Sequence, residues 1–138
     1  MTGGSRADSL ADGLHLDHDE HYVLTDEFLT VWRELMQGEM VDFKGEHLDA
    51  QGGNLRFPPV QRPYPPLYFG GSSPAGLEVG AKHADVYLTW GEPPAQVEEK
   101  VKAVRALAEA QGRTVRFRLR LHVIVRRRGE RRGTRRTT

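Results

Sequence analysis

Hydrophobic residues recur at helical spacing after Thr25. The apolar side chains of this segment fall three or four residues apart, and they are Phe28, Leu29, Val31, Trp32, Leu35 and Met36. Such spacing places them on one face of a helix. Thr25 can cap the start of this helix, and two acidic residues suit its first turn. We therefore predict an amphipathic helix of about three turns that ends at Gly38.

A short hairpin is predicted after this helix. Residues 41–48 alternate between apolar and polar side chains around Gly45, and apolar residues resume after the Gly52–Gly53 pair. Several prolines within residues 58–66 then keep the chain extended and non-helical.

Three compact apolar runs, each bounded by turn residues, predict strands at residues 67–69, 84–90 and 115–125. Between them lie two helical segments, one opened by Pro74 and one over residues 95–111. Strands that alternate with helices form βα units, in which the strands are parallel. The predicted fold class is therefore α/β, with a parallel sheet.

Composition is that of an ordinary globular domain, with 38% hydrophobic and 28% charged residues among 138. Cysteine is absent, which excludes disulfides, thiolate metal sites and cysteine nucleophiles within this chain. No run approaches the roughly 18 apolar residues of a membrane helix, and the first residues lack the pattern of a secretory signal. We therefore expect a cytoplasmic protein with no membrane association.

The formal net charge of +1 conceals an asymmetry. Residues 126–138 contain seven arginines and one glutamate, so the preceding residues carry a net negative charge. This tail has no hydrophobic residue with which to bury a core face. We expect two parts, a folded domain over residues 1–125 and a disordered Arg-rich tail. Because the tail has no interleaved aromatic residues, nucleic-acid binding is not expected.

The turn Gly70–Ser73 is the sharpest candidate for chemistry. In α/β folds, ligands lie at the carboxyl ends of the parallel strands. This turn follows a predicted strand and precedes a helix, so its backbone and hydroxyls could cradle a phosphate at the helix N-terminus. The alternative is a plain βα turn with a serine helix cap. The turn has neither a dinucleotide-binding glycine pattern nor a Walker lysine.

A second candidate is the pair Arg120 and His122. These residues stand two positions apart on the third predicted strand, and hence on one face. Together they could hold an anionic substrate and handle protons. The alternative is a face that lies in solvent, because Arg116 and Arg118 share the same parity.

A third candidate is the cluster of histidines and acids over residues 15–21, which superficially resembles a metal site. It lacks two histidines at i, i+4 spacing and precedes the predicted helix, so we interpret it as a solvated loop and predict no metal. Tyr22 closes the cluster next to the helix start. Its phenol could donate to a phosphate or peroxide oxygen, or its ring could pack under the helix.

Six motifs resemble those of the alkanesulfonate monooxygenases, which belong to the bacterial luciferase-like family of flavin-dependent enzymes. The resemblance runs through residues 2–125. The motifs are LDHDEHY at 16–22, EFLTVWREL at 27–35, VDFKGEHL at 41–48, RPYPPLYFGGSS at 62–73, DVYLTWGEPP at 85–94 and RLHVIV at 120–125.

The resemblance implies a partial (β/α)8 TIM barrel of the luciferase-like type, with about three βα units and a hairpin excursion. A complete barrel takes about 250 residues, so we expect an internal fragment of such an enzyme. The family's cysteine near the flavin and the C-terminal units would then lie outside this chain.

The implied activity is desulfonation of alkanesulfonates in sulfur assimilation. A separate NAD(P)H-dependent FMN reductase supplies FMNH2, which forms a flavin peroxide with O2 and releases aldehyde and sulfite from the substrate. Carried over by position, Tyr22, Gly71, Ser72 and Ser73 would bind the FMN phosphate. The complete enzyme is expected to be a homo-oligomer.

The resemblance also implies that Arg120 and His122 are catalytic and meet the sulfonate and the flavin peroxide. Trp90 would line the same pocket. A guanidinium suits this role because it matches an anionic sulfonate with paired donors.

This chain departs from the family pattern at His21, where arginine is usual, and at Arg118, where glycine is usual. The Arg-rich tail begins where a family helix should start, and its composition is typical of a shifted reading frame. We therefore expect a truncated chain that is weakly active or inactive alone. Two alternatives stay open, another two-component luciferase-like flavin monooxygenase and a non-enzymatic fragment.

Overall fold

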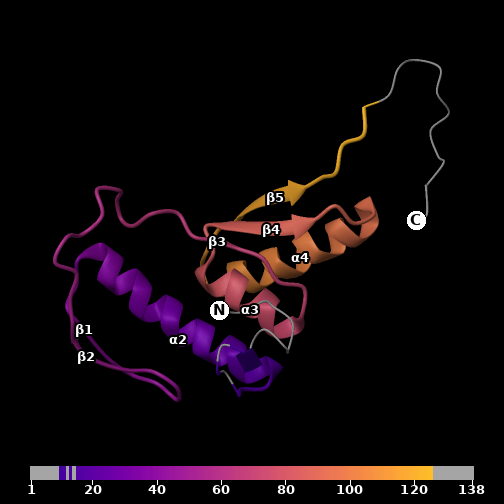
Figure 1. Ribbon diagram of the computed structural model, residues 1–138. Coiled ribbons are helices and arrows are strands. Elements are labelled where there is room, and N and C mark those ends of the chain that lie inside the picture. Colours follow the sequence, from indigo (N-terminus) through magenta and orange to yellow (C-terminus); the bar gives the residue numbers. More distant parts are fainter. Residues whose placement is uncertain (1–9, 12, 14, 126–138) are drawn as a thin grey trace.

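The computed structural model describes residues 10–11, 13 and 15–125 (Figure 1). In this part of the chain, three strands form an open parallel sheet in the order β3-β4-β5, and two further strands form a separate antiparallel pair. The α/β class and the parallel sheet are thereby confirmed. The disorder predicted for residues 126–138 lies outside the described residues. None of the described helices combines the length and apolarity needed to cross a membrane.

The first helix labelled in Figure 1, α2 (His18–Gln37), begins earlier than its hydrophobic pattern predicts. Asp17 is its N-cap, and the carboxylate accepts hydrogen bonds from two first-turn N–H groups, each at 2.9 Å. The Glu20 carboxylate accepts a hydrogen bond from the Asp17 N–H at 2.7 Å, which completes a capping box. The predicted start at Thr25 was therefore wrong. The predicted end was right, because Gly38 adopts the left-handed conformation with φ 88°.

A hairpin made of β1 (Val41–Lys44) and β2 (Asp49–Gly53) packs beside α2 (Figure 1). Its turn is attached to the helix by a single carboxylate. Glu27, which is 8% exposed, accepts hydrogen bonds from the N–H groups of residues 46–48 at 2.5, 3.0 and 2.8 Å. A Cβ atom at Gly45 would lie 2.3 Å from the carboxyl carbon, so glycine leaves the room that this contact needs.

The charge of Glu27 is favoured by its surroundings. Burial alone would raise the pKa of this carboxyl, but three backbone N–H donors point at it and stabilise the ionised form. The net result is a pKa below the ordinary value of 4.5. The hairpin is therefore held by an ionised group that is almost fully removed from water.

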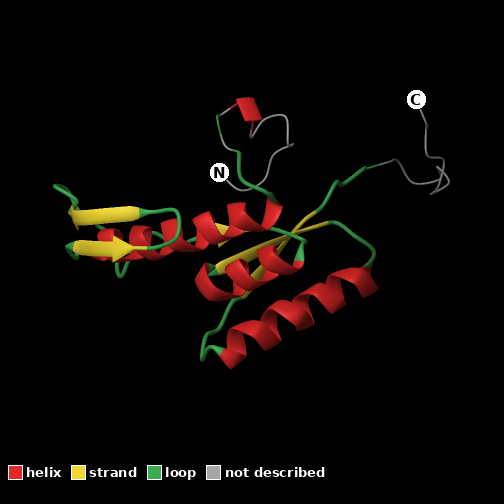
Figure 2. Ribbon diagram, turned by 90° about the horizontal axis from the view of Figure 1, so that it is seen from below, coloured by secondary structure: helices red, strands yellow, loops and turns green. Residues whose placement is uncertain are grey.

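The parallel sheet consists of β3 (Tyr68–Phe69), β4 (Val86–Trp90) and β5 (Arg116–Arg120). The helices α3 (Pro74–His83) and α4 (Pro94–Ala110) connect these strands. Both helices lie on the same side of the sheet, as Figures 1 and 2 show. The two βα connections predicted from the sequence are thus present.

The third strand is shorter than predicted. Its pairing with β4 ends where Trp90 lies opposite Arg120, and residues 121–125 have no strand structure. The apolar run continues to Val125, but a strand needs a neighbour whose hydrogen-bonding groups extend equally far. The extension of this strand beyond Arg120 was therefore wrong for the described chain.

The core lies between the sheet and its two helices. Tyr87 is 1% exposed and forms its centre, packed against buried side chains of both helices and the neighbouring strands, namely Ala81, Val104, Ala108 and Val115. A Cβ atom at Gly80 would come within 2.7 Å of the Tyr87 ring, so glycine allows α3 to approach the sheet closely. Phe117 extends the core, with its ring centroid 6.2 Å from that of Tyr87.

Charged groups join α2 to α3. The carboxylate of Asp26 lies 2.6 Å from Lys82 Nζ and 2.6 Å from Nε2 of His83, a residue that is 2% exposed. Burial lowers the pKa of His83, although Asp26 opposes this effect, so the neutral ring can donate its Nε2–H to the carboxylate. Arg113 binds the end of α3, where its guanidinium donates to the Ala81 carbonyl at 2.6 Å. These contacts join α2 to α3 and tie the end of α3 to the segment that precedes β5.

Replacing Glu27 should detach the hairpin from α2. We expect Glu27→Gln to lower the free energy of unfolding by about 2 kcal/mol at neutral pH, because an amide cannot serve three N–H donors as a carboxylate does. Since the folded-state pKa is lowered, this contribution is present above about pH 4.5 and is lost as the pH falls through the folded pKa. Urea unfolding followed by circular dichroism at a series of pH values measures both effects.

The matched control is Glu34→Gln, which alters an exposed carboxylate on the same helix. It should change stability by no more than about 0.5 kcal/mol. Equal stability of Glu27→Gln and wild type at pH 7 would contradict the anchoring role.

Candidate functional site

The predicted site residues gather around one edge of the parallel sheet. At this edge, the turn Gly70–Ser73 follows β3, the loop Gly91–Pro93 follows β4, and residues 121–125 follow β5. The carboxyl ends of parallel strands meet there, so side chains from distant parts of the sequence come together.

Tyr22 lies against two glycines, Gly71 of the turn Gly70–Ser73 and Gly76 of α3. This residue sits inside α2, and not before its start as predicted. A Cβ atom added to Gly71 would lie 3.2 Å from the Tyr22 hydroxyl oxygen, and one added to Gly76 only 2.9 Å from it. The phenol can approach the turn this closely because both positions lack a side chain.

Ser73 has a structural role at this turn. It is the N-cap of α3, and its Oγ accepts a hydrogen bond from Gly76 N–H at 3.2 Å. Pro74 occupies the first turn, where its missing N–H costs nothing. The hydroxyl proton of Ser73 stays available to a ligand oxygen. The helix-cap interpretation is therefore confirmed, and it is compatible with phosphate binding.

Ser72 contacts a cation that the sequence analysis did not single out. The Nζ of Lys100, from α4, lies 3.1 Å from Ser72 Oγ and 2.8 and 2.7 Å from the two carboxylate oxygens of Glu92. The Lys100 side chain is 13% exposed. Nothing local in the sequence indicates this cluster, because Ser72 and Lys100 are 28 positions apart.

Tyr87 supports the turn from beneath. Its ring lies in the core, and its hydroxyl donates a hydrogen bond to the Gly71 carbonyl. Burial raises the pKa of Tyr87, so the phenol stays protonated as a donor. A tyrosine inside a predicted buried strand is a signal that the sequence analysis overlooked, since a buried tyrosine needs a hydrogen-bond partner.

Trp90 and Arg120 form the second part of the site. They are paired in register at the ends of β4 and β5, and the Arg120 guanidinium carbon lies 5.0 Å from the centroid of the Trp90 ring. This geometry is that of a cation–π contact. Trp90 is 57% exposed, so the pair borders solvent. The structure thus places together two residues that the sequence assigned to one pocket.

His122 is placed differently from the prediction. It was expected beside Arg120 on one face of a strand, but β5 ends at Arg120 and His122 follows in an exposed, irregular segment. The strand geometry used for that prediction does not hold here, because residues 121–125 have no neighbouring strand. The catalytic role of His122 stays a prediction.

The second half of the cluster of histidines and acids, from His18 on, is the start of a helix, and only residues 15–17 lie before it as predicted. His18 and Asp19 pair at 2.7 Å on its exposed surface, with both side chains more than half accessible. Asp17 and Glu20 are occupied by the capping box described above. Among the residues that the structure describes, no group of three or more potential ligands is arranged to hold a metal ion.

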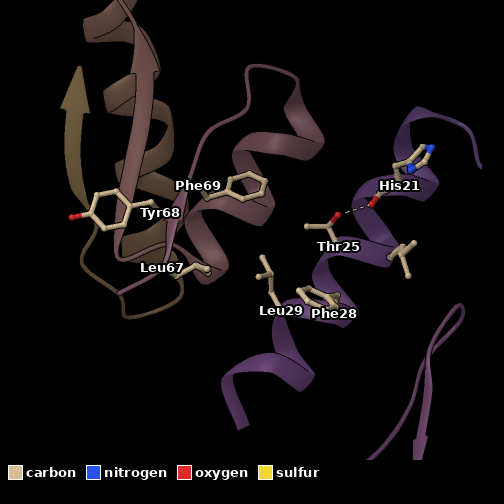
Figure 3. A pocket seen from close by; sticks show the side chains of 8 residues that line it. His21, Thr25, Phe28, Leu29, Leu67, Tyr68 and Phe69 are labelled. Atoms are coloured by element: carbon tan, nitrogen blue, oxygen red, sulfur yellow. Dashed lines mark hydrogen bonds between the residues drawn. The ribbon is translucent and has the colours of Figure 1, made fainter. Parts of the chain in front are cut away.

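A pocket of about 350 Å³ lies between α2 and β3 (Figure 3). Its walls are mostly apolar, and Thr25 uses its hydroxyl to donate to the backbone carbonyl of His21 at 2.8 Å. The lining residues are His21, Leu24, Thr25, Phe28, Leu29, Leu67, Tyr68 and Phe69. None of the predicted site residues lines this pocket.

A sequence model of the luciferase-like monooxygenases matches residues 1–134. The chain belongs to this family. The family membership agrees with the α/β fold and with a candidate site at the carboxyl ends of parallel strands.

Solved structures share the fold of this luciferase-like chain. The EDTA monooxygenase EmoA from Chelativorans sp. BNC1 is 20% identical and superposes with a TM-score of 0.74 over 86% of this chain and 33% of its own. The riboflavin lyase RcaE, solved with modified FMN and riboflavin, is 24% identical, with a TM-score of 0.73 over 83% of this chain and 31% of its own.

A third similar structure is an F420-dependent secondary alcohol dehydrogenase with an F420–acetone adduct. It is 21% identical, with a TM-score of 0.70 over 80% of this chain and 34% of its own. The luciferase-like chain thus spans about a third of the length of the structures it resembles. Likeness at this level of identity shows the fold and leaves the cofactor and substrate to be argued from the site.

The close approach of Tyr22 to the turn can be tested with a methyl group. Gly76→Ala should lower the free energy of unfolding by about 1–3 kcal/mol, because the new Cβ overlaps the phenol, although alanine favours helix. In a Tyr22→Ala background the same substitution should cost at least about 1 kcal/mol less, since the overlap is removed. Urea denaturation of all four proteins gives this coupling. An equal cost in both backgrounds would show that the phenol does not occupy this place.

Proposed function

We propose that this luciferase-like chain forms part of an FMNH2-dependent alkanesulfonate monooxygenase, which uses O2 to convert an alkanesulfonate into an aldehyde and sulfite. The support comes from six sequence motifs over residues 16–125 that resemble this branch of the family. The observation that carries the proposal is geometric. The turn Gly70–Ser73, with Tyr22 against it, and the cationic Arg120, with Trp90, both lie at the carboxyl ends of the strands.

The turn suits the phosphate of FMN. Gly71 and Gly76 let the Tyr22 hydroxyl lie against the turn and the start of α3, where it can act as a donor. Ser72 and Ser73 add hydroxyl groups at the N-terminus of α3, where the helix dipole favours an anion. When bound, reduced flavin would supply the reaction with O2. In this proposal the turn binds the phosphate end and so orients the flavin.

The Trp90–Arg120 pair suits a sulfonate. A guanidinium offers paired N–H donors that match two sulfonate oxygens, and it keeps its charge at any physiological pH. The indole of Trp90 holds this guanidinium at the end of β5 and provides an apolar surface for an alkyl chain. His122 follows two positions later, where an imidazole could take up or release a proton.

The remaining parts of the proposal concern the whole enzyme. A separate NAD(P)H-dependent FMN reductase would supply the reduced flavin, and the enzyme would be a cytoplasmic homo-oligomer. Within this chain, we propose that residues 1–125 form the barrel portion.

The first test is FMN binding, measured by the change in flavin fluorescence on titration with protein. We expect saturable binding by wild type. The double variant Ser72→Ala plus Ser73→Ala should bind FMN with an affinity reduced by about 10-fold or more, because two donors to a charged phosphate are lost. Circular dichroism and urea unfolding of the same variant separate this loss from loss of the α3 cap. A wild-type chain that binds no FMN would refute the proposed cofactor site.

The second test addresses the sulfonate. Octanesulfonate should change the fluorescence of Trp90 in a Trp32→Phe background, which leaves one tryptophan, and Arg120→Met should abolish the change. The matched control is Arg116→Met, which removes the same charge from the other end of β5. An identical response in the two arginine variants would show that Arg120 does not bind the sulfonate.

A further inference from the structure

Lys100 occupies a position that the proposed function does not use. It projects from α4 toward the turn Gly70–Ser73 and joins two loops that follow different strands. Its ammonium contacts Ser72 of the β3–α3 turn at 3.1 Å and Glu92 of the β4–α4 loop at 2.7 Å. Among the hydrogen bonds of the described residues, it is the one cationic side chain bound to that turn.

A neighbouring lysine shows what an ordinary surface pair looks like here. Lys102 pairs with Glu98 one helical turn away on α4, and both side chains are largely accessible, at 68% and 64%. The Lys100 and Glu92 side chains are only 13% and 30% exposed. Partial burial of an ammonium is unfavourable unless acceptors surround it, and the structure provides two acceptors of different strength. One is a carboxylate, and the other is the neutral hydroxyl of Ser72.

The contact with Ser72 places the Lys100 ammonium next to the turn that is proposed to bind the phosphate. A phosphate monoester carries a charge of about −1.5 to −2 at neutral pH, more than a carboxylate, and offers three oxygens. The lysine ammonium has three donors and acts as a point charge on a flexible chain, so it can exchange one acceptor for another. Glu92 therefore competes with a phosphate for the same cation.

We propose that Lys100 is a phosphate-binding residue of the flavin site, held at the turn by Glu92 until the phosphate arrives. This inference rests on the proposed function and adds a cation and its counter-ion to the same site. It predicts discrimination between flavins that differ only in the phosphate. It also predicts opposite effects for removal of the cation and removal of its counter-ion.

The experiment compares FMN and riboflavin, titrated by flavin fluorescence into the purified 138-residue chain. Lys100→Met should weaken FMN binding by about 10- to 100-fold, the loss expected for a hydrogen bond to a charged group. Riboflavin binding should be unchanged, because riboflavin has no phosphate. Lys102→Met, which removes the same charge from the same helix, should bind both flavins as wild type does.

Glu92→Gln distinguishes ligand binding from a purely structural salt bridge. If the pair only stabilises the fold, both Glu92→Gln and Lys100→Met break it, and both weaken FMN binding alike. If Lys100 binds the phosphate, Glu92→Gln frees the ammonium and should tighten FMN binding several-fold, with no change for riboflavin. Equal losses in the two variants would overturn the inference.

The remaining outcomes separate this inference from the proposed function. A wild-type chain that binds FMN no better than riboflavin has no phosphate site, and both proposals are refuted. A wild-type preference for FMN that survives in Lys100→Met supports the proposed cofactor site and refutes the role of Lys100 alone. Circular dichroism spectra of every variant must match that of wild type. The ratio of the FMN affinity to the riboflavin affinity is a second control, because it does not depend on the fraction of chain that is folded.

Discussion

The burial of Tyr87 is the interaction on which the rest of the structure depends. Its ring fills the space between the sheet and the two helices, and Gly80 permits α3 to lie close enough to cover it. Its hydroxyl reaches the Gly71 carbonyl and fixes the turn that begins α3. A single side chain thus links hydrophobic packing to the geometry of the candidate site. The position of the turn therefore depends on the packing of the core beneath it.

The two parts of the candidate site have different physical characters. The turn is a backbone site, formed by glycines, a helix N-terminus and a few hydroxyls, and its shape follows from the packing of α2 and α3. The Trp90–Arg120 pair is a side-chain site, formed by one contact between adjacent strands. The face of β4 and β5 that carries this pair is not covered by the helices, and it also carries Leu88 and Arg118. In a barrel, that face is the interior.

Local sequence patterns were sufficient to predict the βα units, but they were insufficient to predict where individual helices and strands begin and end. The apolar runs around Phe69, Tyr87 and Phe117 indicated three strands correctly, because periodicity and turn residues are local signals. The start of α2 was missed, since the capping box at Asp17 lies in a charged segment with no apolar period. The end of β5 was missed because it depends on where β4 ends.

The candidate site was likewise predictable from the sequence only where its residues lie in local motifs. The glycine turn and the Trp90–Arg120 pair follow recognisable apolar runs, and their motifs are contiguous. The roles of Glu27 and Lys100 are set by partners about 20 and 28 positions away, so no window of the sequence displays them. Long-range hydrogen bonds made by charged side chains are therefore the part of this molecule that only the structure reveals.

The attachment of the hairpin to α2 determines which sequence changes the hairpin turn at residues 45–48 can tolerate. Glu27 contacts the turn only through main-chain N–H groups, which every residue except proline possesses. Substitutions at Glu46 or Leu48 can therefore accumulate without loss of the anchor, whereas an insertion would move the N–H groups out of reach. The length of the turn at residues 45–48 is therefore constrained more strictly than the identity of its side chains. Gly45 is the exception, because a Cβ there would overlap the Glu27 carboxylate.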